Sequence, residues 1–240
     1  MKVKTARRDA RTKPNKQAHP SDCFFDRFPE SCRENPAKMK AYRTYDDAFR
    51  VLDSESWDIL KAKAVVHFRD HRAGQLKQGF FNQLNEAFAY RHLVRRGYSA
   101  VRLLPERGKR VPDLQYRDRR RLRHCEVKTL SISQEEISRR SSREASSNSY
   151  VILDEGFFNK LTSTISAAKG QIDAQGTTGL VYLVVIWDDI ALDYYRRYRR
   201  DLAAFARARA VDDVHIKVGL RFNRRMRLTS ACRRRRPVKS

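Results

Sequence analysis

An uninterrupted apolar run, LVYLVVIW at residues 180–187, is the sequence feature that most constrains the fold. A strand without polar residues suits the centre of a sheet, where both of its faces are covered. Strictly alternating apolar residues near the C-terminal end predict another strand. The strands expected from these patterns are residues 98–104, 111–117, 122–130, 179–187 and 214–222.

Apolar residues recur at helical spacing in the segments around these strands. Gly74 and Gly97 bracket the longest helix of the N-terminal half, and Thr44 with Asp47 has the spacing of a capping box. Ser54 is a candidate cap for the helix that follows. The expected helices are residues 44–52, 54–68, 75–96, 156–174 and 190–209.

Together these elements predict an α/β fold with three layers, in the order helix, three strands, helix and strand. We expect one domain over residues 46–222, with its core at about residues 75–187, preceded by helices and followed by a helix–strand addition. Residues 1–45 contain four prolines and no apolar periodicity, which predicts a mostly irregular basic arm. Residues 223–240 predict a mobile basic tail.

Positive charge dominates the chain, with 52 Lys and Arg against 28 Asp and Glu among 240 residues, a net charge of +24. The N-terminal arm holds 12 basic and 5 acidic residues, and the C-terminal tail holds 8 basic and no acidic ones. Arginine, which binds phosphate in a planar, bidentate way, outnumbers lysine 37 to 15. Nucleic acid is the expected partner; a solubilising surface and a tether to an anionic membrane are the alternatives.

Several classes of protein are excluded or disfavoured by composition. No apolar run reaches 18 residues, so no membrane span is expected. The four cysteines form neither CxxC pairs nor a dense disulfide pattern, which indicates reduced thiols and a cytoplasmic location. Phosphate-binding GxxxxGK[ST] loops and GxSxG elbows are absent, so neither a motor ATPase nor a serine hydrolase is indicated.

The chemistry concentrates in two consecutive strands that can pair as a hairpin around residues 118–121. A turn centred there places Asp113 opposite Glu126, with their side chains about 4.5–5.5 Å apart on one face. Period two puts Lys128 on the same face, one pleat along. Two adjacent carboxylates repel unless a cation lies between them. An arginine could supply that cation in a structural ion pair, and a hard divalent ion such as Mg²⁺ is the other solution.

This pattern, Pro112-Asp113 followed by Glu126-Val127-Lys128, resembles the signature of the PD-(D/E)xK, or restriction-endonuclease-like, nuclease superfamily. That superfamily has a core of helix, three antiparallel strands, helix and a fourth strand, which is the order predicted above. The resemblance implies that Asp113 and Glu126 bind Mg²⁺, with Mn²⁺ as a substitute, and that Lys128 assists the nucleophile.

The same resemblance implies further site residues on the two core helices. The first helix of the superfamily often supplies an acidic residue, for which Glu86 is the candidate. The second often supplies a polar residue, for which Lys160 and Gln171 are candidates, since both lie on one helical stripe.

The leading hypothesis is therefore a Mg²⁺-dependent phosphodiesterase. An endonuclease is favoured over an exonuclease, and DNA is favoured over RNA as the substrate. A non-catalytic nucleic-acid-binding protein on the same fold and an RNA-directed toxin-like nuclease are the alternatives. Specificity is expected from a second copy of the chain, a partner protein or the shape of the substrate. The arginines expected to contact nucleic acid are Arg119, Arg120, Arg139, Arg140, Arg233, Arg234, Arg235 and Arg236.

Overall fold

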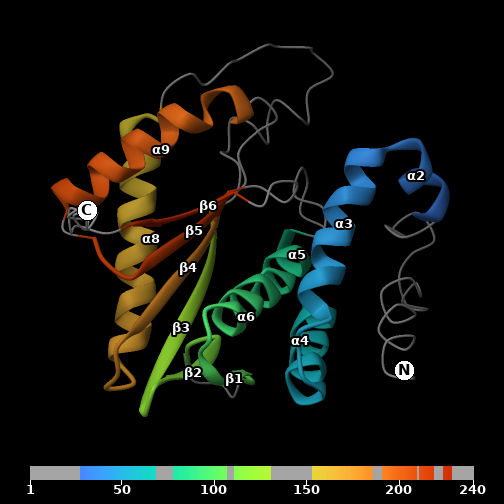
Figure 1. Ribbon diagram of the computed structural model, residues 1–240, viewed down its shortest axis with the longest axis horizontal. Helices are drawn as coiled ribbons and strands as arrows, with labels where there is room; N and C mark the ends of the chain where they lie inside the picture. Colours follow the sequence, from blue (N-terminus) through green and yellow to red (C-terminus); the bar gives the residue numbers. More distant parts are fainter. Residues whose placement is uncertain are drawn as a thin grey trace, which may run out of the picture.

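The computed structural model describes residues 28–68, 78–106, 111–130, 153–185, 191–209, 211–218 and 224–228. These residues form one sheet with helices on both of its faces, so the chain is a mixed α/β protein (Figure 1). Residues 131–149 lie outside the described residues, as do residues 1–27 and 229–240.

The described residues contribute six strands to this sheet, in the order β1-β2-β3-β4-β5-β6. Strand β2 is antiparallel to both β1 and β3, β4 is parallel to both β3 and β5, and β6 is antiparallel to β5. A strand is therefore present in each of the five predicted segments. The strands are β1 (Ser99–Leu103), β2 (Leu114–Asp118), β3 (Arg121–Leu130), β4 (Gly179–Val185), β5 (Val214–Val218) and β6 (Arg224–Leu228).

Helices from the N-terminal half cover one face of the sheet, and two later helices lie on the other (Figure 1). The first set is α3 (Pro36–Phe49), α4 (Ser54–His67), α5 (Gln78–Leu84) and α6 (Glu86–Arg95), with α2 (Phe28–Glu34) against α3. The second set is α8 (Glu155–Asp173) and α9 (Ala191–Ala208). Each face of the sheet has its own cluster of buried apolar side chains. The structure therefore has the three predicted layers, with the sheet in the middle and helices on either side.

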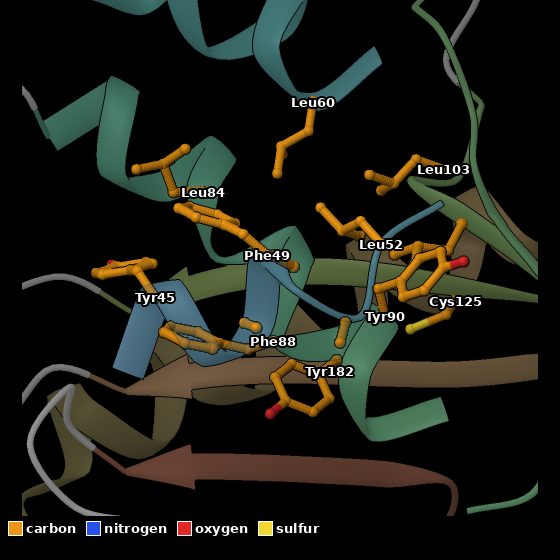
Figure 2. Packing of buried hydrophobic residues seen from close by; sticks show 14 of the residues in the cluster. Tyr45, Phe49, Leu52, Leu60, Leu84, Phe88, Tyr90, Leu103, Cys125 and Tyr182 are labelled. Carbon is orange, nitrogen blue, oxygen red and sulfur yellow. The ribbon is translucent and has the colours of Figure 1, made fainter. Parts of the chain in front are cut away.

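The apolar strand β4 connects the two clusters because its alternate side chains point to opposite faces. Leu183 is fully buried in the cluster beneath α8 and α9. Tyr182 is fully buried in the cluster beneath α3 to α6. Figure 2 shows Tyr182 in that cluster together with Tyr45, Phe49 and Phe88. The expectation of a strand covered on both faces is confirmed.

Helical structure begins earlier than the sequence predicted. Residues 28–45 were expected to be mostly irregular, yet they belong to α2 and α3. Pro36 is the first residue of α3, a position where proline costs no hydrogen bond, so this proline starts a helix and does not prevent one. Thr44 does not cap a helix, because its hydroxyl donates to the carbonyl oxygen of Lys40 within α3. Tyr45 is buried in the core, which stabilises α3 against the sheet layer.

The predicted helix over residues 75–96 is two helices that meet at Asn85. The Asn85 carbonyl accepts from Phe88 N, an i to i+3 bond that tightens the turn here. The Asn85 side chain accepts a bond from the Tyr45 hydroxyl at 3.0 Å and donates one to Thr129 Oγ1 at 2.9 Å. Asn85 therefore links α3, the start of α6 and β3.

The C-terminal tail also starts later than predicted. Residues 224–228, expected to belong to a mobile tail, form β6 and pair with β5. An edge strand of this kind needs only backbone pairing along one side, so charged side chains are tolerated. Within β6, Arg227 contacts Asp213 at 2.7 Å.

Candidate active site

The site lies where β2 starts and β3 continues past it. Leu114, the first residue of β2, pairs with Cys125 of β3, which confirms the predicted hairpin register. Beyond this pair β3 has no β2 backbone beside it, and the N–H of Val127 instead donates to Asp113 Oδ2 at 2.8 Å. This bond holds the Asp113 carboxylate against β3, next to Glu126.

Glu126 is a buried carboxylate in the middle of the described sheet, with a side chain only 2% exposed. Its Oε2 atom is buried and accepts no hydrogen bond within the described part of the chain. Burial, followed by the negative charge of Asp113, raises the pKa of Glu126 to about 7, although Lys128 acts in the opposite direction. A buried carboxylate oxygen without a donor lacks the partner that such groups normally have, and a cation is one group that could supply it.

Lys128 lies beside Glu126, as the period-two pattern predicted. Its Nζ atom donates to Glu126 Oε1 at 2.5 Å and to the side-chain oxygen of Gln171 at 2.9 Å. Gln171 comes from α8, which lies on the face of the sheet opposite α3 to α6, so a side chain of α8 orients the lysine. The side chain of Lys128 is 32% exposed and is thus accessible from solvent while both bonds hold it.

Glu86, the first residue of α6, joins the same cluster through a residue that sequence reasoning missed. Lys63 of α4 places its Nζ 2.9 and 3.0 Å from the two carboxylate oxygens of Glu86 and 3.4 Å from Asp113 Oδ1. Its position, three residues after Leu60 and next to Ala64, puts it on the buried side of α4. A lysine on the apolar stripe of a helix is almost never buried without a partner, and this was the available signal.

The charges in this cluster depend on one another. Burial would lower the pKa of Lys63, but the carboxylates of Glu86 and Asp113 outweigh it and hold that pKa above its ordinary value. For Glu86, burial and then the charge of Asp113 raise the pKa well above its ordinary value, while Lys63 opposes this effect. The cluster therefore holds the Lys63 ammonium firmly charged beside Glu86, whose raised pKa favours a proton or a nearby cation.

Comparison with known proteins gives no relative for this chain. No protein-family model, curated protein or solved structure matches it. A function proposed for it therefore rests on the residues of this site and on the charge of the molecule. In the described helices there is no stretch long and apolar enough to cross a membrane.

The remaining predicted site residues differ in where they lie. Lys160 is on an exposed part of α8, about 16 Å before Gln171 along the helix axis, so Gln171 is the α8 residue that meets the site. Arg119 and Arg120 are exposed in the turn between β2 and β3. The other predicted nucleic-acid contacts, Arg139, Arg140 and Arg233 to Arg236, lie outside the described residues.

Within the described ranges, no group of three or more His, Cys, Asp or Glu side chains has the arrangement of a complete metal cage. Asp113 and Glu126 supply two carboxylates next to each other, and the third, Glu86, is engaged by Lys63. An ion held by one or two carboxylates and otherwise by water is the usual mode for Mg²⁺. The arrangement thus fits a hydrated divalent ion better than an ion enclosed by protein.

Proposed function

We propose that this chain is a metal-dependent nuclease with a restriction-endonuclease-like core, which hydrolyses phosphodiester bonds. DNA is the favoured substrate and RNA the second choice. The observation that carries the proposal is the buried Oε2 of Glu126, which has no hydrogen-bond donor among the residues that the structure describes and lies in a site with Asp113 and Lys128. The order of α6, β1, β2, β3, α8 and β4 supports the resemblance to the PD-(D/E)xK superfamily.

Asp113 and Glu126 would hold Mg²⁺, or Mn²⁺ in its place. Each carboxylate oxygen of these two residues accepts at most one of the hydrogen bonds from Val127 N, Lys63 and Lys128, so lone pairs for coordination remain on both residues. A bound divalent ion would lower the pKa of a coordinated water and stabilise negative charge on the phosphate. Two adjacent carboxylates, of which Asp113 is 18% exposed, are the kind of ligands that such an ion uses together with water.

The side chains of the chain itself supply positioning and charge. Lys128 can orient an attacking water or stabilise the charge that develops on the phosphate oxygens, because its ammonium is fixed by Glu126 and Gln171. The N–H of Val127 keeps the Asp113 carboxylate against β3. Because these side chains are already held in place, less entropy has to be lost when the substrate and the catalytic groups reach the reactive geometry.

The positive charge of the molecule supports a nucleic-acid substrate. With a net charge of +24, the chain attracts polyanions irrespective of their sequence. Arg119 and Arg120, on the exposed hairpin turn, are the predicted contacts that fall within the described residues. We expect the protein to act in the cytoplasm, where buried thiols such as Cys32 and Cys125 stay reduced.

A non-catalytic nucleic-acid-binding protein is the second candidate, and one observation favours it. Lys63 already neutralises Glu86 and contacts Asp113, so part of the acidic cluster is satisfied as a structural ion-pair network without a metal. An RNA-directed toxin-like nuclease is a further candidate with the same site. The two enzymes differ in substrate, whereas the binding protein differs in having no reaction.

One panel of reactions separates these candidates. The full chain is incubated with circular plasmid, single-stranded DNA and tRNA, each with Mg²⁺, Mn²⁺ or EDTA. Metal-dependent nicking of the circular plasmid is the expected result, since a closed circle can be cut only by an endonuclease. Cleavage of tRNA alone would favour the RNA-directed nuclease. If folded protein binds these substrates and cuts none, the binding protein is the better description.

The matched variant for this panel is Asp113→Ala, which removes one of the two proposed metal ligands. We expect it to abolish cleavage and to weaken Mn²⁺ binding measured by calorimetry, because a single remaining carboxylate supplies too few oxygens. Unchanged Mn²⁺ affinity in this variant would contradict the assignment of the metal site.

A further inference from the structure

Lys63 occupies a position between two acidic side chains that come from different elements. Its ammonium lies 2.9 and 3.0 Å from the Glu86 oxygens and 3.4 Å from Asp113 Oδ1. Glu106, a more exposed carboxylate, lies 4.0 Å from it. A positive group bridging Glu86 and Asp113 does for these carboxylates what a bridging cation would do.

The structure holds Lys63 in this place. Its side chain is 6% exposed, and α4 is fixed in the core by buried Leu60 and Ala64 on either side of it. An ammonium attached to an anchored helix cannot move out to solvent without leaving Glu86 buried and unpaired, at large cost. Lys63 is therefore a permanent part of the site.

The balance of charge limits how many divalent ions the site can hold. Three carboxylates, Glu86, Asp113 and Glu126, together with the more exposed Glu106, face two ammonium groups, those of Lys63 and Lys128. The cluster therefore carries at most two net negative charges, which one divalent ion neutralises. A second divalent ion would have to displace Lys63 from Glu86 or leave the cluster with an excess of positive charge.

We propose that Lys63 replaces a second metal ion, so that the site binds one divalent ion through Asp113 and Glu126. This inference rests on the proposed function, since it assumes that Asp113 and Glu126 bind a metal. Glu86 then pairs with Lys63 and does not ligate the ion. Lys63 acts as a positioning residue that keeps Glu86 off the metal and adds a fixed positive charge to the site.

The test is the number of Mn²⁺ ions bound per full-length chain, measured by electron paramagnetic resonance of free Mn²⁺ and by calorimetry. We expect one ion in the wild type and two in Lys63→Met, which leaves Glu86 and Asp113 without their ammonium. Lys61→Met is the control, because Lys61 lies on the same helix, is exposed and pairs with Asp58; one ion is expected.

A second variant keeps the test decisive if Lys63→Met does not fold. Lys63→Met with Glu86→Gln removes both partners of the ion pair and preserves the net charge. One Mn²⁺ is expected, with an affinity within about tenfold of the wild type, the smallest loss that outer-shell changes typically cause. Loss of binding as complete as in Asp113→Asn would make Glu86 a metal ligand and overturn the proposal.

The remaining outcomes separate this inference from the proposed function. Two Mn²⁺ ions on the wild type, or one on a folded Lys63→Met chain, would overturn the role given to Lys63 while leaving the metal-dependent nuclease intact. No Mn²⁺ on the folded wild type would overturn both the metal site and the role of Lys63.

Discussion

Gly179 pairs with His124 at a point where the backbones of β3 and β4 leave no space for a side chain. A Cβ atom on residue 179 would lie 1.8 Å from the carbonyl oxygen of His124, far inside van der Waals contact. The obstacle is backbone, so it cannot rotate away. Because His124 precedes Glu126 by two residues, this close approach also fixes the strand that holds the site.

Gly179→Ala should therefore lower the free energy of unfolding by about 3 kcal/mol or more, measured by urea denaturation. Gly170→Ala is the control, since a Cβ at this position in α8 meets nothing within 4 Å. Alanine in a helix interior should stabilise the chain by about 0.5–1 kcal/mol. Equal stability of the two variants would show that β3 and β4 are not paired as described.

The site residues differ in how far the sequence could predict them. Asp113, Glu126 and Lys128 were predictable because they lie on consecutive strands, and the short turn between these strands fixes the register. Lys63 was not, because it belongs to a separate helix, and nothing local shows which carboxylates lie across from a buried lysine. Gln171 was predicted only as one of two positions on a helical stripe.

At the scale of whole elements, α4 is fixed to the core at its N-terminal end by Asp53. Oδ1 of Asp53 accepts from Ser56 N at 2.7 Å, which caps the helix, and Oδ2 accepts from the Tyr90 hydroxyl at 2.9 Å. Burial would raise the pKa of Asp53, but these hydrogen bonds outweigh it and hold the pKa below its ordinary value of 3.8. The cap thus connects α4, which carries Lys63, to α6, which carries Glu86.

We predict that Asp53→Ala lowers the free energy of unfolding by about 1–2 kcal/mol at pH 7, as loss of a helix cap does. Because the pKa of Asp53 is lowered in the folded state, its contribution is present above pH 3.8 and is lost as the pH falls through the folded-state pKa. The difference between the variant and the wild type should therefore shrink between pH 7 and pH 3. A difference that stays constant would contradict the role of the ionised carboxylate.

Three features of the helices and strands were missed by the sequence, each for a different physical reason. In α3, prolines suggested irregular chain, although proline at the first position of a helix is compatible with it. The division between α5 and α6 depends on the bonds of Asn85 to Tyr45 and Thr129, which are distant in sequence. The arginine-rich β6 is held by pairing with β5, and composition gives no sign of that pairing.

On the scale of the whole molecule, the proposed function gives the positive charge and the acidic site separate roles. The net charge of +24 favours binding to any nucleic acid, whereas the carboxylates of the candidate site are few, and Glu86 and Glu126 among them are buried. Affinity is therefore expected to depend on many arginines and lysines, and cleavage on a small number of side chains. Variants at the two kinds of residue should affect binding and rate independently.

Deletion of residues 233–240 removes five positive charges, Arg233 to Arg236 and Lys239, and leaves β6 intact. If these residues contact phosphates, the slope of log K against log salt should become shallower by up to about 4, with unchanged cleavage products. Deletion of residues 237–240, which removes only Lys239, is the control and should change the slope by about 1 at most. An equal slope for both deletions would show that the arginines do not bind phosphate.

The most direct test of the proposed nuclease is the cleavage rate of Lys128→Met, measured beside its affinity for the same substrate. Methionine keeps the volume of the side chain and removes the ammonium that contacts Glu126 and Gln171. The rate should fall by about 100-fold or more, the scale for one preoriented charge. Affinity should change little, because one of 52 basic residues makes at most one phosphate contact. Lys128→Met that cuts at the wild-type rate, as exposed Lys61→Met should, would contradict the assignment of this site.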